Sequence, residues 1–143
     1  MGSLRINFDM AEKEETDSSS ELKAPPFPIV GVGASAGGLE ALEELFAHTP
    51  KDIGMAFVVV THQHPSHTSL LPELLGRSTQ LPVIAAKDGV GLQPNHVYVA
   101  PPGTHMALLN ESLHFMDPNQ GESIRLPIDY FFRSLAEDKK ERA

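Results

Sequence analysis

Cysteine is absent from this chain of 143 residues. Disulfides, thiolate metal sites and a cysteine nucleophile are therefore excluded. Basic residues are also few, because 11 Lys and Arg stand against 19 Asp and Glu, for a formal net charge of -8. This balance argues against nucleic acid and anionic membrane surfaces as partners. No apolar run has the length of a membrane span, and no signal-peptide pattern opens the chain. We expect a cytoplasmic protein that is not inserted in a membrane.

Apolar side chains are scarce in the first 26 residues, which are acidic and rich in serine. Such a segment buries too little apolar surface to offset the entropy lost on ordering. We predict a disordered tail over residues 1–26. The remainder, residues 27–143, is long enough for one domain with a sizeable core.

Apolar runs and amphipathic stretches alternate from Phe27 onward. Strands are predicted over residues 29–33, 55–61 and 81–85, and helices over 37–47 and 65–76, with a last helix from Pro127. The strands are apolar enough to be covered on both faces, which is typical of a parallel α/β sheet. The expected helical core faces are Leu39, Leu42, Leu45 and Phe46, then Leu70, Leu71, Leu74 and Leu75, then Ile128, Phe131, Phe132 and Leu135.

The stretch after Asp88-Gly89 has a different pattern, with short alternating runs between turns. Residues 96–100 alternate, and residues 106–109 and 113–116 flank a turn, which predicts a hairpin. We expect a β-hairpin insertion on a Rossmann-like, doubly wound core of three parallel strands, cut short at the C-terminus.

Residues 31–38 join the first strand to the first helix and place Ser35 among glycines. Three interpretations compete. The glycines can simply permit a tight turn and close helix packing. They can also form a dinucleotide-binding loop, but the spacing departs from G-x-G-x-x-G, and the second strand closes with Thr61-His62 instead of an acid. Finally, residues 33–37 fit G-x-S-x-G, in which the serine is a nucleophile.

His62 supports the third interpretation. It follows the second predicted strand, and the carboxyl ends of parallel strands share one edge of the sheet. A serine hydroxyl needs a base, and a histidine on the neighbouring strand end is placed to supply one. The helix after Ser35 would direct its N-terminal N–H groups toward developing negative charge.

His62, His64 and His67 together read H-x-H-x-x-H after a strand, a spacing that permits metal ligation. A metal-dependent hydrolase is therefore an alternative, although Ser66 stands where such hydrolases carry an aspartate. We treat His64 and His67 as bystanders. His96 and His105 fall in the predicted insertion and carry no motif, so neither is assigned a function.

Several blocks of the chain, in order, resemble the catalytic domain of CheB-type protein-glutamate methylesterases. Residues 29–42 resemble the nucleophile block of that family, residues 58–75 its histidine block, residues 90–103 the segment between, and residues 127–135 a helix that follows. The resemblance spans residues 27 to 135.

The resemblance implies a serine hydrolase of chemotaxis signalling that removes methyl esters from chemoreceptor glutamates and can deamidate glutamines. Ser35 would be the nucleophile and His62 the base, with backbone N–H groups of Ala36 and Gly37 as oxyanion donors. No metal or other cofactor is expected. The implied partners are methyl-accepting receptors and, as a second possibility, a methyltransferase or sensor kinase module.

Two departures from the family pattern bear on activity. The G-x-G-x-D-G block that carries the third member of the triad is not in these residues, and Asp88, Asp117 and Asp129 have no matching context. Residues 1–26 also cannot form a receiver domain. The alternatives are a catalytically weak or inactive interaction module, and a fragment of an esterase–methyltransferase (CheB–CheR-type) fusion.

Overall fold

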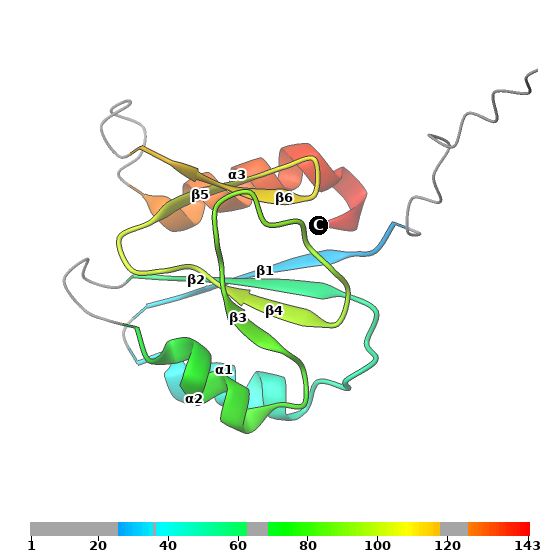
Figure 1. Cartoon of the computed structure of the whole chain (residues 1–143), viewed down its shortest axis with the longest axis vertical. Helices are drawn as coiled ribbons and strands as arrows, with labels where there is room; N and C mark the ends of the chain where they lie inside the picture. The colour runs from blue at the N-terminus through cyan, green and yellow to red at the C-terminus, as the bar shows by residue number, and fades with distance from the viewer. Residues whose placement is uncertain (1–25, 36, 63–68, 118–125) are drawn as a thin grey trace, which may run out of the picture.

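Four parallel strands form the central sheet of the computed structural model, which describes residues 26–35, 37–62, 69–117 and 126–143. Their order is β1-β2-β4-β3, and all their carboxyl ends therefore lie at one edge (Figure 1). The strands are β1 (Ile29–Ala34), β2 (Ala56–Thr61), β3 (Val83–Ala85) and β4 (His96–Val99). The predicted parallel α/β class is confirmed.

The place of β4 corrects the sequence interpretation, which put residues 96–100 in the insertion and allowed only three parallel strands. β4 lies between β2 and β3 and is parallel to both. Val97, Tyr98 and Val99 are all buried, because both faces of this central strand are covered. The alternation in the sequence suggested a strand with one solvent-exposed face. In the structure the two more polar residues of the strand, His96 and Tyr98, pack against each other with their ring centroids 6.1 Å apart.

Two helices cover one face of the sheet. These are α1 (Leu39–Ala47) and α2 (Leu71–Ser78), whose buried side chains meet Phe57, Val59, Val97 and Val99. The predicted core faces were too wide, since Leu45 and Leu70 are 45% and 61% exposed. Each helix buries only a narrow stripe of apolar side chains, because it packs on one face of a single sheet. The second helix also begins later than predicted, at Leu71, with Pro72 in its first turn.

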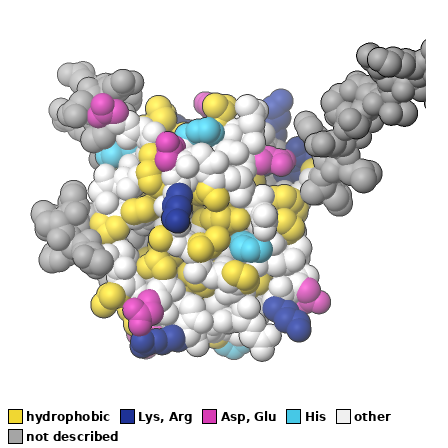
Figure 2. Space-filling view, viewed as in Figure 1, with side chains coloured by type: hydrophobic (Ala, Val, Ile, Leu, Met, Phe, Trp, Pro, Cys, Tyr) yellow, Lys and Arg dark blue, Asp and Glu magenta, His cyan; other side chains and the backbone are white. Residues whose placement is uncertain are grey.

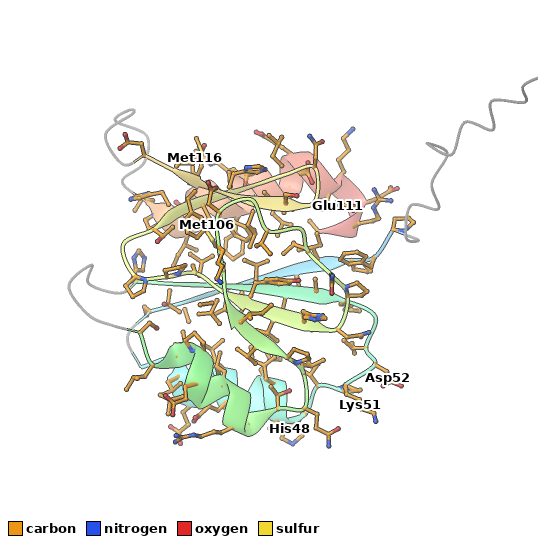
Figure 3. The ribbon with its side chains drawn as sticks, viewed as in Figure 1. His48, Lys51, Asp52, Met106, Glu111 and Met116 are labelled. Atoms are coloured by element: carbon orange, nitrogen blue, oxygen red, sulfur yellow. The ribbon has the colours of Figure 1, made fainter. Side chains whose placement is uncertain are left out.

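A hairpin and the last helix cover the other face (Figure 1). The hairpin is β5 (His105–Leu109) and β6 (Ser112–Met116), and the helix is α3 (Pro127–Lys139), followed by a 3₁₀ turn over Lys140–Arg142. The predicted hairpin is therefore confirmed. In Figure 3, Met106 points from β5 into the layer between hairpin and sheet, where it is fully buried.

Glycines in β1 allow α3 to lie directly against this strand. A β-carbon added at Gly31 would lie 2.5 Å from Phe132 Cε1, and one added at Gly33 would lie 2.9 Å from Ile128 Cγ2. Both distances are much shorter than the van der Waals contact distance between two carbon atoms. The close-packing interpretation of these two glycines is thus correct, although the helix that needs them is α3 and not the helix that follows Ser35.

The far end of the hairpin is tied to the end of α3. Asn110 and Glu111 form the turn with positive φ angles, and their N–H groups donate to the carboxylate of Asp138 at 2.8 and 3.3 Å. Buried Lys139 pairs with Glu111, which Figure 3 labels at this turn. These contacts fix the hairpin as a rigid cover over the sheet.

Figure 2 shows apolar side chains gathered over the middle of the face that it presents, with a Lys or Arg side chain and a His side chain among them and most other charged groups toward the margins. Ile84 in the edge strand β3 is 42% exposed. Pro82 precedes this short strand and Lys87 follows it closely, as is typical of edges protected against pairing with other chains. Among the described residues, no helix combines the length and the apolar character needed to cross a membrane.

The burial of Tyr98 makes the free energy of unfolding depend on pH in the alkaline range. Burial raises the pKa of its phenol above 10.0, partly opposed by the hydrogen bond that Gln93 N–H donates to it at 2.9 Å. The folded chain holds this proton more tightly than the unfolded chain, so the free energy of unfolding is expected to fall as pH rises above about 10. Urea titrations at pH 8 to 11 measure this. Tyr98→Phe should show a shallower decline, and equal declines would contradict the assignment.

Candidate active site

Ser35 and His62 follow the last residues of two neighbouring strands. β1 ends at Ala34 and β2 at Thr61, and these residues are register partners. The N–H of His62 donates to the carbonyl of Ala34 at 3.2 Å, so the pairing continues to the residue at which His62 stands. Adjacent parallel strands lie about 4.8 Å apart. The sheet therefore brings the two predicted catalytic residues side by side at its carboxyl edge.

The chain turns sharply after Ser35. Gly37 has a φ of +92°, a conformation that a residue with a side chain rarely adopts. The N–H of Gly38 donates to the Ser35 carbonyl at 3.0 Å and closes the turn. A tight strand-to-helix turn of this kind holds a serine side chain away from the sheet.

Helix α1 begins within four residues of Ser35. Its N-cap, Gly38, offers no side-chain hydrogen bond to the first turn. The first N–H groups of a helix without such a cap are free to bind a ligand, and the helix dipole favours negative charge at this end. The arrangement can therefore stabilise an oxyanion that forms next to Ser35.

Both candidate side chains are accessible, since Ser35 and His62 are exposed. Within the described part of the chain, no hydrogen bond joins the Ser35 hydroxyl to the His62 ring. Catalytic hydrogen bonds are commonly long in free enzymes and shorten when substrate binds. The two groups are thus on adjacent strand ends and accessible from solvent.

Replacing Gly38 with alanine is expected to disturb Ser35 directly. The new β-carbon would lie 2.8 Å from Ala34 Cβ and 3.1 Å from the Ser35 carbonyl oxygen, so the turn must move. We expect the rate of Ser35 acylation to fall by about tenfold or more, because small displacements of a nucleophile are costly. Acylation kinetics with a fluorophosphonate measure the effect. Gly37→Ala is the control variant, because its new β-carbon meets nothing within 4 Å and the substitution adds only backbone strain. Equal acylation rates for Gly38→Ala and the parent chain would contradict the prediction.

Several predicted site residues lie outside the described residues, namely Ala36, His64 and His67. The predicted tail is also outside, apart from Pro26. The oxyanion role of Ala36 and the metal-site alternative for the histidine cluster therefore stay predictions. Gly37 is described and lies in the turn, because the helix begins at Leu39 and not at residue 37 as predicted. Its oxyanion role stays a prediction.

The structure describes two of the aspartates considered as the third triad member, Asp88 and Asp129. Asp88 accepts a hydrogen bond from the N–H of Phe115 in β6 at 2.8 Å. Asp129 lies exposed in the first turn of α3. That neither residue is the third triad member stays a prediction from the sequence.

Sequence reasoning passed over His105, the first residue of β5. Its Nδ1 atom is buried without a hydrogen-bond partner, and within the described residues it is the sole side-chain nitrogen or oxygen in that condition. The only signal in the sequence was its place directly after the turn at residues 101–104.

Comparison with known proteins places this arrangement in a family. The CheB methylesterase family model matches residues 30–143. A protein-glutamate methylesterase/protein-glutamine glutaminase of Desulfotalea psychrophila is 31% identical over 132 residues, which cover 88% of this chain and 36% of the relative. A second relative, the protein-glutamate methylesterase/protein-glutamine glutaminase 2 of Methanospirillum hungatei, is 32% identical over 111 residues. The match covers 77% of this chain and 32% of the relative.

A solved structure agrees with these matches. The crystal structure of the Thermotoga maritima CheB methylesterase catalytic domain superposes with a TM-score of 0.68 at 30% identity, covering 82% of this chain and 64% of that one. The chain spans about a third of the length of the two curated relatives. Sequence, fold and strand-end geometry agree, and the chain belongs to the CheB methylesterase family.

Proposed function

We propose that this chain supplies the nucleophile and the general base of a protein-glutamate methylesterase. The observation that carries the proposal is the register of β1 and β2, which puts Ser35 and His62 on adjacent strand ends of a CheB-family fold. The names of the relatives point to methylated glutamates and to glutamines as the substrate groups.

The reaction follows from the order of these groups. Ser35 Oγ attacks the ester carbonyl while His62 takes its proton, and free N–H groups at the start of α1 stabilise the oxyanion. The tetrahedral intermediate collapses, the C–O bond to methoxide breaks, and His62 returns the proton so that methanol leaves. Water, deprotonated by His62, then hydrolyses the acyl-enzyme and frees Ser35.

The third member of the triad affects the expected rate. These 143 residues contain no G-x-G-x-D-G block, and in a known triad the loss of the orienting aspartate lowers kcat by about 10⁴-fold. We infer that the 143-residue chain is a weak esterase. A partner segment that supplies a carboxylate to His62 would raise the rate.

Methanol release from a helical peptide that carries a γ-methyl glutamate ester tests the proposal. The supporting result is slow methanol release with mass-spectrometric acylation on Ser35. Binding of the peptide with neither turnover nor acylation would favour the interaction-module alternative. Stoichiometric zinc in the purified protein would favour the metal-dependent hydrolase.

The names of the relatives give protein glutamates and glutamines as substrate groups. The chemoreceptor as the protein that carries them comes from the family resemblance, and we propose it for this chain on that basis. A methyltransferase or sensor kinase partner, and a cytoplasmic location, stay predictions from the sequence.

A further inference from the structure

His105 differs from the histidines that the fold uses structurally. His48 Nδ1 lies 2.8 Å from the Glu44 carbonyl, and His96 Nδ1 lies 2.8 Å from the Pro94 carbonyl. Each of these local bonds fixes the tautomer and the orientation of its ring. The Nδ1 atom of His105 is buried and has no partner, although its ring is only half-buried.

A buried polar atom without a hydrogen-bond partner lowers the stability of the fold and calls for an explanation. The other side chains of β5 are apolar, with Met106 and Leu108 buried in the core and Ala107 half-buried. A residue that contributes no internal hydrogen bond and yet costs stability is typical of a functional group.

The turn before His105 directs it to the edge of the sheet that carries Ser35 and His62. Ala100 N–H donates to Val59 O at 2.9 Å, so the chain leaves β4 beside the end of β2. Residues 101–104 then form a turn closed by Thr104 N–H and Pro101 O at 3.3 Å, with Gly103 at a φ of +68°. Proline at the second position and glycine at the third are the residues that a type II turn requires.

The hairpin register agrees with this placement. His105 pairs with Met116 at the open end of the hairpin. Met116 is labelled in Figure 3 on the same side of the molecule as the carboxyl ends of β1 and β2 (Figures 1 and 3). The rigid turn and the anchored Met106 therefore hold His105 at the rim of the candidate active site, on the face covered by α3.

We propose that His105 is a substrate-binding residue, whose ring makes a hydrogen bond to the peptide that presents the glutamyl ester to Ser35. The proposal rests on the proposed function and adds a specificity group to the same site. A half-buried ring without an internal bond can turn about its Cβ–Cγ bond, so a nitrogen reaches the substrate without a change in the fold.

The test measures peptide affinity and folding stability separately. The Ser35→Ala chain is titrated with the helical γ-methyl glutamate ester peptide, labelled for fluorescence anisotropy, with and without a change at His105. His105→Leu should raise the Kd about tenfold, the usual effect of losing one hydrogen bond, while Tm stays level or rises. His105→Asn and His105→Gln, which present an amide near Nδ1 or Nε2, should bring the Kd of at least one variant back to within about threefold.

His96→Leu is the matched control. It removes the bond to Pro94 and the stacking on Tyr98, so Tm should fall while the affinity of the folded protein for the peptide is unchanged. An unchanged Kd in His105→Leu, a fall in its Tm as large as that of His96→Leu, or no peptide binding in the Ser35→Ala parent overturns the proposal. Acylation of Ser35 by a small fluorophosphonate, measured in the chain that keeps Ser35 and His105, tests the proposed function separately from peptide binding.

Discussion

Ser35→Ala is expected to abolish covalent labelling of the chain by a fluorophosphonate and to stop methanol release from the ester peptide. The hydroxyl is the only group that the proposed mechanism allows to form the acyl-enzyme, so no residual labelling should remain. Ser35 is exposed and lies in a turn after β1, hence the substitution should leave the fold and Tm unchanged. Intact-mass spectrometry after overnight incubation measures the adduct, and peptide mapping locates it.

His62→Gln tests the second half of the same pair. A positioned general base contributes about 10²–10⁴-fold to such reactions, so the acylation rate should fall by that factor while Ser35 remains the site that is labelled. Ser78→Ala, at the end of α2, is the serine control and should label at the parent rate. Labelling that survives in Ser35→Ala, or an unchanged rate in His62→Gln, would remove the case for a serine esterase.

Gly31→Ala is expected to be among the most destabilising single-atom additions in the sheet. Its β-carbon would lie 2.5 Å from Phe132 Cε1 and 2.9 Å from Leu135 Cδ2, so α3 must move off β1. Overpacking of this kind costs about 1–3 kcal/mol. For a domain of this size we expect a fall in Tm of roughly 5–15 °C, measured by circular dichroism.

Two comparisons make the Gly31 experiment specific. Gly76→Ala adds the same atom in α2, where nothing lies within 4 Å, and should stabilise the protein by about 0.5 kcal/mol through helix propensity. Gly31→Ala combined with Phe132→Leu should recover part of the loss, because the shorter side chain clears the clash. If Gly31→Ala were as stable as the parent chain, the close contact between β1 and α3 would be wrong.

Much of the fold, and the adjacent placement of Ser35 and His62, was predictable from the sequence because the signals are local. Apolar runs of strand length, amphipathic helices and the glycine turn around Ser35 each lie within about a dozen residues. The parallel arrangement then follows from the alternation of strands and helices, which puts Ser35 and His62 on one edge. The family resemblance depended on the same contiguous blocks and was confirmed by the family match.

The tertiary structure decided what depends on contacts between distant residues. Only the strand order reveals that His96–Val99 is a central strand of the sheet, since its alternating pattern predicted membership of the insertion. Only the packing of α3 explains Gly31 and Gly33, which lie about a hundred residues before the side chains that need them. His105 carries no motif, and its unpartnered nitrogen is visible only once the turn and the hairpin place it at the rim. The sequence by itself determined the candidates for nucleophile and base, Ser35 and His62. The fold determined which residues from distant parts of the chain pack together, because long-range packing is not recorded in any local sequence pattern.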